Sequence, residues 1–171
     1  MKKRQLIASF QVDHTRIVPG IYVSRRDAID GGFITTFDIR MKRPNVEPAV
    51  HPNAMHTIEH IVATYLRNSA FKDHIVYWGP MGCLTGCYLL VKTREDIQPA
   101  QIEPLIRAAF RHLARYRGEV PGATPVNCGN YQLHDLAMAK YEAAEFLKRT
   151  WKFDYPAARR VRAGGRVVFD A

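Results

Sequence analysis

The chain has 171 residues and a formal net charge of +9, with 47% hydrophobic and 24% charged residues. This balance is typical of folded globular proteins and excludes a disordered chain. No apolar run approaches the ~20 residues that span a bilayer, and no secretory signal follows Met1. We therefore expect a cytoplasmic protein with no membrane partner, and a single domain over residues 1–171.

Most of the excess positive charge lies at the two ends. Residues 2–4 are all basic, and residues 159–170 hold four arginines against Asp170, so six of the nine charges come from these two segments. Such charge runs are more typical of solvated ends than of a nucleic-acid binding surface. We predict mobile basic tails at 1–8 and 157–171, a catalytic region at about 9–155, and no nucleic-acid partner.

The first recognisable elements are strands and a helix. Residues 33–41 alternate apolar and polar side chains, which is typical of a half-buried strand with Thr36, Asp38 and Arg40 on its second face. Residues 55–66 have the apolar spacing of a helix, for which Asn53 is a suitable N-cap.

The rest of the chain continues the pattern of strands and helices. Short strands are predicted at 75–78 and 87–92, separated by a glycine-rich loop, and amphipathic helices at 102–113 and 133–151. The order is strand, strand, helix, strand, strand, helix, helix. It predicts an α+β fold in which an antiparallel sheet is packed on one face by the first, histidine-bearing helix and the two later helices.

The predicted first helix carries the strongest chemical signal. His56 and His60 are four residues apart, so their side chains leave one face of the helix and can meet one ion. A third ligand is then needed, and Cys128, in the loop at 121–130, is the best candidate because its thiolate binds Zn(II) and Fe(II). Glu59 is placed to act as a general acid or base beside such a metal.

Two other functions fit the same residues less well. The order H-x-x-E-H is also used by a class of metallopeptidases, but in those enzymes the third metal ligand is a carboxylate rather than a cysteine. A structural metal in a nucleic-acid-binding module would need a fourth protein ligand, which the sequence does not reveal. The remaining histidines of the chain's central part fall in no motif and are assigned surface or structural roles: His51, His74, His112 and His134.

The three cysteines do not form a disulfide framework, because their number is odd and the expected compartment is reducing. Cys83 lies in the glycine-rich turn, where a thiolate can be exposed and reactive. Cys87 begins an apolar strand, so we predict that it packs in the core.

Five segments together resemble the LuxS family, the S-ribosylhomocysteine lyases. Their order and spacing match across residues 9–151, and only the tails lie outside. The segments are SFQVDHT at 9–15, FDIR at 37–40 followed by PN at 44–45, HTIEH at 56–60, PMGCLTG at 80–86, and CG at 128–129.

The resemblance implies a carbon–sulfur lyase that cleaves S-ribosylhomocysteine to homocysteine and 4,5-dihydroxy-2,3-pentanedione, the autoinducer-2 precursor used in quorum sensing. It implies carbonyl migration followed by β-elimination of the thiol, with one divalent ion per chain, Fe(II) natively and Zn(II) as a substitute. The implied metal ligands are His56, His60 and Cys128. Cys83 would carry protons as a thiolate, with Glu59 as its carboxyl partner.

Substrate contacts and assembly also follow from the resemblance. Ser9, His14 and Arg40 match positions that line the family's substrate pocket, and the family is homodimeric with pockets at the subunit interface. The sequence departs from the family pattern at residues 77–79, where many members have Asp and then Ser, and at Thr36, where a Lys is common. Substrate contacts near these positions are therefore expected to differ.

Overall fold

The computed structural model describes residues 12–156, so Ser9 and both predicted tails lie outside the described residues. The strands and α-helices follow one another in the predicted order, with a short 3-10 helix before the third strand. The elements are β1 (Gly20–Ile29), β2 (Gly32–Arg40), α1 (Pro52–Arg67), the 3-10 helix η2 (Lys72–His74), β3 (Ile75–Pro80), β4 (Gly86–Thr93), α2 (Pro99–Ala114) and α3 (Leu136–Lys148).

The four strands form one antiparallel sheet in the order β1-β2-β4-β3. A tight turn joins β1 to β2, and Gly31 supplies its left-handed residue at φ 74°. The inner strands β2 and β4 are aligned so that Phe37 lies opposite Leu89 and Arg40 opposite Gly86. This register places the C-terminal end of β2 beside the turn that contains Cys83.

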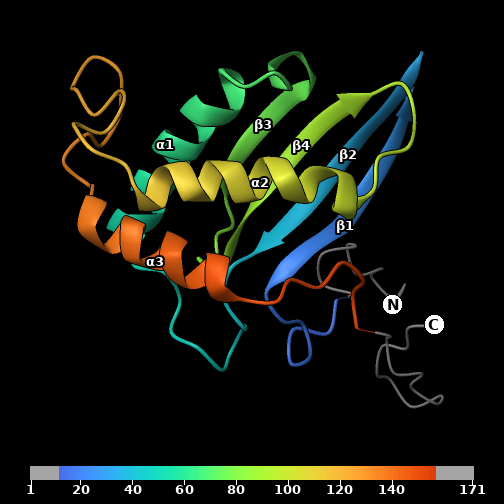
Figure 1. Cartoon of the computed structure of the whole chain (residues 1–171), viewed down its shortest axis with the longest axis horizontal. Coiled ribbons are helices and arrows are strands. Elements are labelled where there is room, and N and C mark those ends of the chain that lie inside the picture. Colours follow the sequence, from blue (N-terminus) through green and yellow to red (C-terminus); the bar gives the residue numbers. More distant parts are fainter. Residues whose placement is uncertain (1–11, 157–171) are drawn as a thin grey trace, which may run out of the picture.

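All three α-helices lie on one face of the sheet (Figure 1). One set of alternating strand residues, including Ile21, Phe37 and Leu89, packs with buried residues of the helices, such as Ile58 and Phe110, in a single hydrophobic core. The α+β prediction is therefore confirmed. In the described part of the chain, no helix is both long and apolar enough to cross a bilayer.

Two helix boundaries differ from the prediction. α1 begins at Pro52 with His51 as N-cap, not Asn53; the His51 ring accepts the Asn53 N–H at 3.4 Å. α3 starts later than residue 133, because the Asp135 carboxylate accepts the Met138 N–H at 2.9 Å and caps the helix there. His134 consequently lies in a loop rather than on a helix.

Candidate active site

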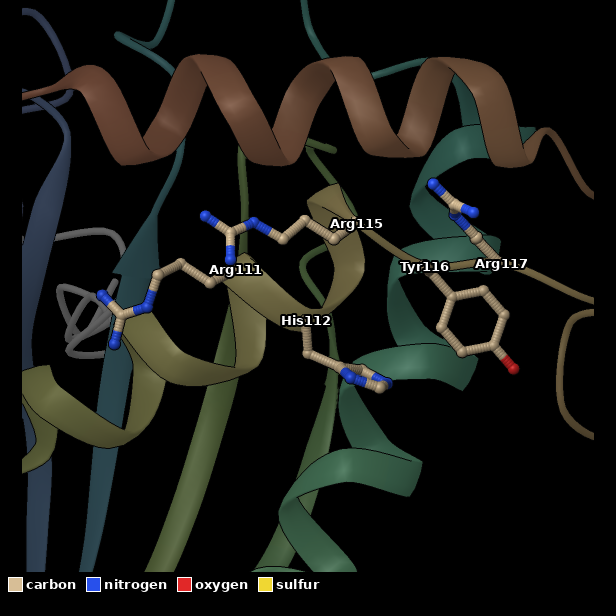
Figure 2. Close-up of a pocket in the computed structure, with 5 residues that line it drawn as sticks. All are labelled: Arg111, His112, Arg115, Tyr116 and Arg117. Carbon is tan, nitrogen blue, oxygen red and sulfur yellow. The ribbon is translucent and has the colours of Figure 1, made fainter.

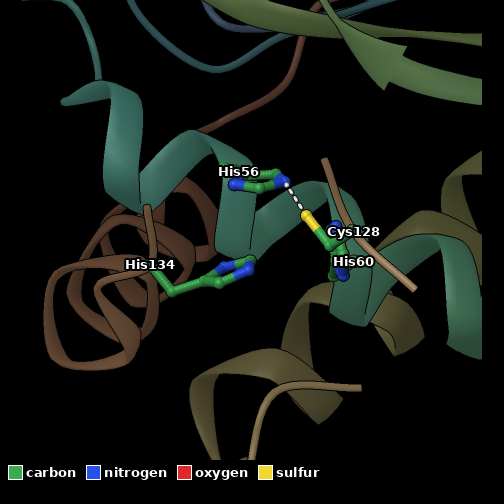
Figure 3. Close-up of side chains that lie close together, drawn as sticks. All are labelled: His56, His60, Cys128 and His134. Carbon is green, nitrogen blue, oxygen red and sulfur yellow. Dashed lines mark hydrogen bonds between the residues drawn. The ribbon is translucent and has the colours of Figure 1, made fainter. Parts of the chain in front are cut away.

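Four potential metal ligands gather where α1 meets the loop before α3 (Figure 3). His56 and His60 come from α1, and Cys128 and His134 come from the loop. One ligand atom from each lies within 4.8 Å of the others. These residues, here called the ligand cluster, could hold a metal ion.

The backbone orients the two helix histidines. The Nδ1–H of His56 donates to the Leu133 carbonyl at 2.8 Å, and that of His60 donates to the Pro121 carbonyl at 2.7 Å. Each Nε2 therefore presents a lone pair. The two rings are nearly perpendicular, at 86°, with centroids 4.6 Å apart.

Cys128 completes an arrangement that fits one ion. Its Sγ lies 3.4 Å from His56 Nε2. Ligands at ~2.3 and ~2.1 Å from a tetrahedral ion are roughly 3.5 Å apart, so this separation fits joint coordination. The Asn130 N–H donates to the same Sγ at 3.4 Å and helps to orient it.

The loop that carries Cys128 is shaped to reach α1. Gly122 has φ 69°, a left-handed conformation that favours glycine, and it directly follows the Pro121 carbonyl that binds His60. The Cys128 N–H then donates to Thr124 at 3.0 Å, closing a local turn. The same loop thus orients one histidine and supplies the thiol.

His134, to which the sequence analysis gave a surface or structural role, lies beside the other three residues of the ligand cluster. Thr57 fixes its tautomer, because the Thr57 hydroxyl donates to Asn53 O at 2.9 Å and accepts the Asp135 N–H at 3.0 Å. The 3.2 Å contact with His134 Nδ1 must then be donated by the imidazole. Its Nε2 keeps a lone pair and, among the described residues, is buried without a partner.

The orientation of His134 distinguishes it from the other three residues. Its ring stacks on His56 with centroids 4.2 Å apart and planes 18° apart. A metal lies near the plane of each imidazole that binds it, and two stacked, nearly parallel planes do not meet at the ~2 Å metal–nitrogen distance. This geometry fits His56, His60 and Cys128 as joint ligands, with His134 alongside. The position of His134, six residues after Cys128 and directly before a helix cap, was the available sequence signal.

The surroundings of His134 favour its neutral form. Burial lowers the pKa of His134, and the neighbouring His56 and His60 lower it further. A neutral imidazole is the form that can accept a hydrogen bond or bind a metal at Nε2.

A second cluster, here called the thiol cluster, lies at the turn between β3 and β4 and consists of Cys83, Thr85, Arg40 and Asp38. Cys83 Sγ lies 3.1 Å from Thr85 Oγ1 and 3.8 Å from Arg40 Nη1. Burial acts to raise the pKa of Cys83, but hydrogen bonds from Thr85 and the positive charge of Arg40 outweigh it, so that the pKa is lowered. Cys83 is also exposed, as a reactive thiol must be.

Arg40 is held rigidly behind this thiol. Asp38 binds it through two hydrogen bonds, Nε to Oδ1 at 3.1 Å and Nη2 to Oδ2 at 2.5 Å, and both side chains are only 3% exposed. Burial opposes the charge of Arg40, yet Asp38 outweighs it and raises the pKa of Arg40. Arg40 Nη1 donates to Thr85 at 2.6 Å, which leaves the Thr85 proton free to point at Cys83.

His14 and Glu59 are the other predicted residues within the described part of the chain. His14 Nδ1 donates to the Val12 carbonyl at 2.8 Å. Burial raises the pKa of Asp38, and Arg40 and, more weakly, His14 act against this rise. Glu59 is half-buried on α1. Burial raises the pKa of Tyr77 and of Cys87, and the negative charge of Glu59 raises both further. Within residues 12–156, the hydrogen bonds of the thiol cluster and the ligand cluster share no residue.

Cys87 differs from Cys83 as predicted. It is fully buried against Met55, with its Sγ 3.6 Å from the Met55 sulfur. Burial raises the pKa of Cys87 well above its usual value, and the charge of Glu59 adds to this effect. The prediction that Cys87 packs in the core is confirmed.

A surface hollow of about 330 Å³ at the end of α2 does not form a comparable site. Figure 2 shows Arg111 and Arg115 extending away from Tyr116 and Arg117, so their charges do not converge on one point. Basic residues at a helix C-terminus also complement its dipole without any ligand.

Comparison with known proteins agrees with this geometry. The family model described as S-ribosylhomocysteinase (LuxS) matches residues 7–155. Relatives named S-ribosylhomocysteine lyase include one from Phocaeicola vulgatus, 58% identical over 142 residues, which cover 82% of this chain and 87% of the relative. A second relative, from Porphyromonas gingivalis, is 56% identical over 83% of this chain and 89% of its own length. A third, from Borreliella burgdorferi, is 46% identical over 86% of this chain and 92% of its own length. The chain belongs to the LuxS family.

Proposed function

We propose that the protein is an S-ribosylhomocysteine lyase that releases homocysteine and 4,5-dihydroxy-2,3-pentanedione. The observation that carries the proposal is the ligand cluster, in which two oriented histidines and a cysteine converge in a chain that belongs to the LuxS family. Close relatives with this name extend over most of the chain. In a bacterium this reaction would recycle homocysteine and supply the autoinducer-2 precursor.

His56, His60 and Cys128 are the proposed metal ligands, one ion per chain. Their convergent donor atoms support this choice over His134, whose ring plane is nearly parallel to that of His56. We propose Fe(II) as the native ion and Zn(II) as a substitute, because both accept imidazole and thiolate ligands. When bound, the ion supplies Lewis-acid polarisation of a carbonyl, which acidifies the adjacent C–H.

Cys83 is the proposed proton carrier for the carbon atoms. A base in this reaction must remove a proton from one carbon and return it to another, which requires a group that is substantially ionised near neutral pH. The lowered pKa of Cys83 and its exposure match that requirement. The final elimination likewise needs a base to remove the proton beside the carbon that loses the thiol.

Glu59, Ser9, His14 and Arg40 take supporting roles in the proposal. Glu59 moves hydroxyl protons, since it lies next to His60 in the chain and is half-buried on the same helix. Arg40 and His14 bind substrate, and the proximity of Arg40 to Cys83 and of His14 to the Asp38–Arg40 pair supports this. Ser9 rests on the family resemblance alone.

We further propose a cytoplasmic homodimer whose sites lie at the subunit interface. The supporting feature is the sheet face opposite the helices, where strand alternation places Ile34, Tyr88 and Leu90. These side chains are only partly buried, and Tyr77 beside Leu90 is 45% exposed. A second copy packed on this face would cover the apolar surface.

A direct assay tests the proposed reaction. Protein loaded anaerobically with Fe(II) is incubated with S-ribosylhomocysteine, and released thiol is titrated against time. We expect catalytic release of homocysteine, with no release after the metal is removed by a chelator and recovery after it is restored. Metal-loaded protein that releases no thiol would exclude the proposed function.

A further inference from the structure

Residues 151–155 form a strap that crosses from the end of α3 to the sheet. Trp151 is buried, stacked on Phe146 at 4.3 Å and covered by Arg107 at 3.9 Å. The Lys152 carbonyl accepts the Ile21 N–H at 2.8 Å, which ties the strap to the first residues of β1. These contacts fix the strap on both sides of its crossing.

The strap brings Tyr155 onto the sheet face opposite the helices. Its ring stacks on Tyr22 with centroids 4.6 Å apart and planes 11° apart. Its hydroxyl donates to Asp38 Oδ2 at 3.1 Å. Tyr155 thus covers the Asp38–Arg40 pair, which is buried at 3% exposure although it lies on the face without helices.

A continuous chain of contacts then leads from the strap to the thiol. Tyr155 binds Asp38, Asp38 holds the guanidinium of Arg40 at two points, and the remaining Arg40 nitrogen reaches Thr85 and Cys83. Because Nε, Nη1 and Nη2 all take part in these bonds, the Arg40 guanidinium is held in one orientation. Its charge is therefore directed at the Cys83 sulfur.

We propose that Tyr155 is a positioning residue that keeps Cys83 reactive by shielding and polarising the Asp38–Arg40 pair. The inference rests on the proposed function only in treating Cys83 as the working thiolate. Tyr155 is separated from Cys83 by three contacts, through Asp38 and Arg40, and is not proposed to touch substrate.

Two physical effects predict the direction of change when Tyr155 is altered. Burial raises the pKa of Asp38, and Arg40 and the Tyr155 hydroxyl act to lower it and so favour the ionised carboxylate. The positive end of the O–H dipole also offsets part of the potential of that carboxylate, so without it Asp38 offsets more of the positive potential that Arg40 produces at Cys83. The Tyr155 ring excludes water, so without it solvent screens the same charge. Both effects destabilise the thiolate and make Cys83 less reactive at neutral pH.

The experiment measures alkylation of Cys83 by iodoacetamide across a range of pH, in metal-loaded protein, with the modified peptide identified by mass spectrometry. The other groups whose charges act on or with Cys83 are Arg40, Cys87 and Tyr88, and all stay in place. Tyr155→Phe keeps the stacked ring and removes only the hydroxyl; we expect roughly twofold slower alkylation at pH 7. Tyr155→Ala removes both, and we expect a several-fold loss with the midpoint of the pH profile moved upward.

Tyr141→Phe and Tyr141→Ala are the matched controls, because Tyr141 is 57% exposed on α3 and should leave the profile unchanged. If Tyr155→Ala unfolds, Tyr155→Phe still decides the question. A Tyr155→Phe profile identical to that of the unaltered protein would overturn the proposal. Because alkylation reads the thiolate without substrate, a failed lyase assay would refute the proposed function and leave this measurement valid.

Discussion

The ligand cluster and the thiol cluster are built by opposite means. In the ligand cluster, each of the two histidines on α1 is oriented by one bond to a backbone carbonyl of the loop that carries Cys128. In the thiol cluster, side chains orient one another, since Asp38 holds Arg40 and in turn accepts a hydrogen bond from Tyr155. Both clusters join segments that are distant in sequence: His56 lies 72 residues from Cys128, and Arg40 lies 43 residues from Cys83. The geometry of the ligand cluster therefore depends on the backbone of α1 and of one loop, whereas the reactivity expected of Cys83 depends on a chain of side chains across the sheet.

This difference predicts different responses to mutation. Loss of a metal ligand should empty one cluster and leave the other intact. Loss of a contact in the thiol cluster should change a pKa and a rate without removing the metal. Metal content and thiol reactivity are therefore separate readouts of the two clusters.

The largest effect is expected from His60→Ala and Cys128→Ala. Each removes one of three proposed ligands, so we expect metal content to fall from one ion per chain to nearly none, with complete loss of turnover. Elemental analysis of the purified variants measures this directly. His74→Ala, at an exposed histidine of η2 outside both clusters, is the control and should retain full metal. Undiminished metal in either ligand variant would refute the assignment.

Cys83→Ala should be the next most severe change, and Cys87→Ala its matched comparison. Removing a general acid–base group costs roughly 10²–10⁴-fold in turnover, and this reaction uses the group in successive steps. We expect Cys83→Ala to keep its metal and fold while losing nearly all homocysteine release. Cys87→Ala should remain active and unfold at a lower temperature, because it removes only buried packing. Near-normal turnover by Cys83→Ala would show that another group carries the proton.

The pH dependence of turnover should follow the Cys83 thiolate. Because the pKa of Cys83 is lowered, activity should persist below the usual thiol range and fall only as the pH drops through that lowered pKa. Arg40→Lys loses the two-point contact with Asp38 and the aimed charge, so the fall should begin at a higher pH. We expect a loss of roughly tenfold at pH 6, measured from initial rates of thiol release. Arg111→Lys on the exposed face of α2 should leave the profile unchanged.

The sequence predicted the ligand cluster better than the thiol cluster, for a physical reason. The spacing of His56 and His60 fixes their common face once α1 forms, and a periodic apolar pattern is sufficient to predict α1. The α+β class followed in the same way from the order of the elements. Helix ends were less accurate, since His51 and Asp135 cap the helices through side-chain contacts that the apolar pattern does not encode.

What the sequence did not reveal depends on contacts between distant segments. The sequence predicted that Asp38 and Arg40 share one strand face, and the structure has them as an ion pair that also contacts Cys83. The sequence pattern did not predict that this pair is buried, because the residue that covers it, Tyr155, follows α3 and is distant in the chain. His134 was missed because its role depends on α3 beginning at Leu136, which leaves the histidine in the loop beside His56.

The smallest of the expected effects concerns His134 and tests whether the ligand cluster has three ligands or four. Because its ring is stacked nearly parallel to His56, His134→Gln should leave the ion in place and weaken its binding by about tenfold, the range of an outer residue that supports a ligand. Thr57→Val, which removes the partner of His134 Nδ1, should produce a similar or smaller change. Competition with a chromophoric chelator measures both affinities, and the visible spectrum of the cobalt-substituted protein reports any change in the ligand set. A loss of metal as complete as that in His60→Ala would show that the imidazole of His134 rotates to bind the ion, and the cluster would then be a four-ligand site.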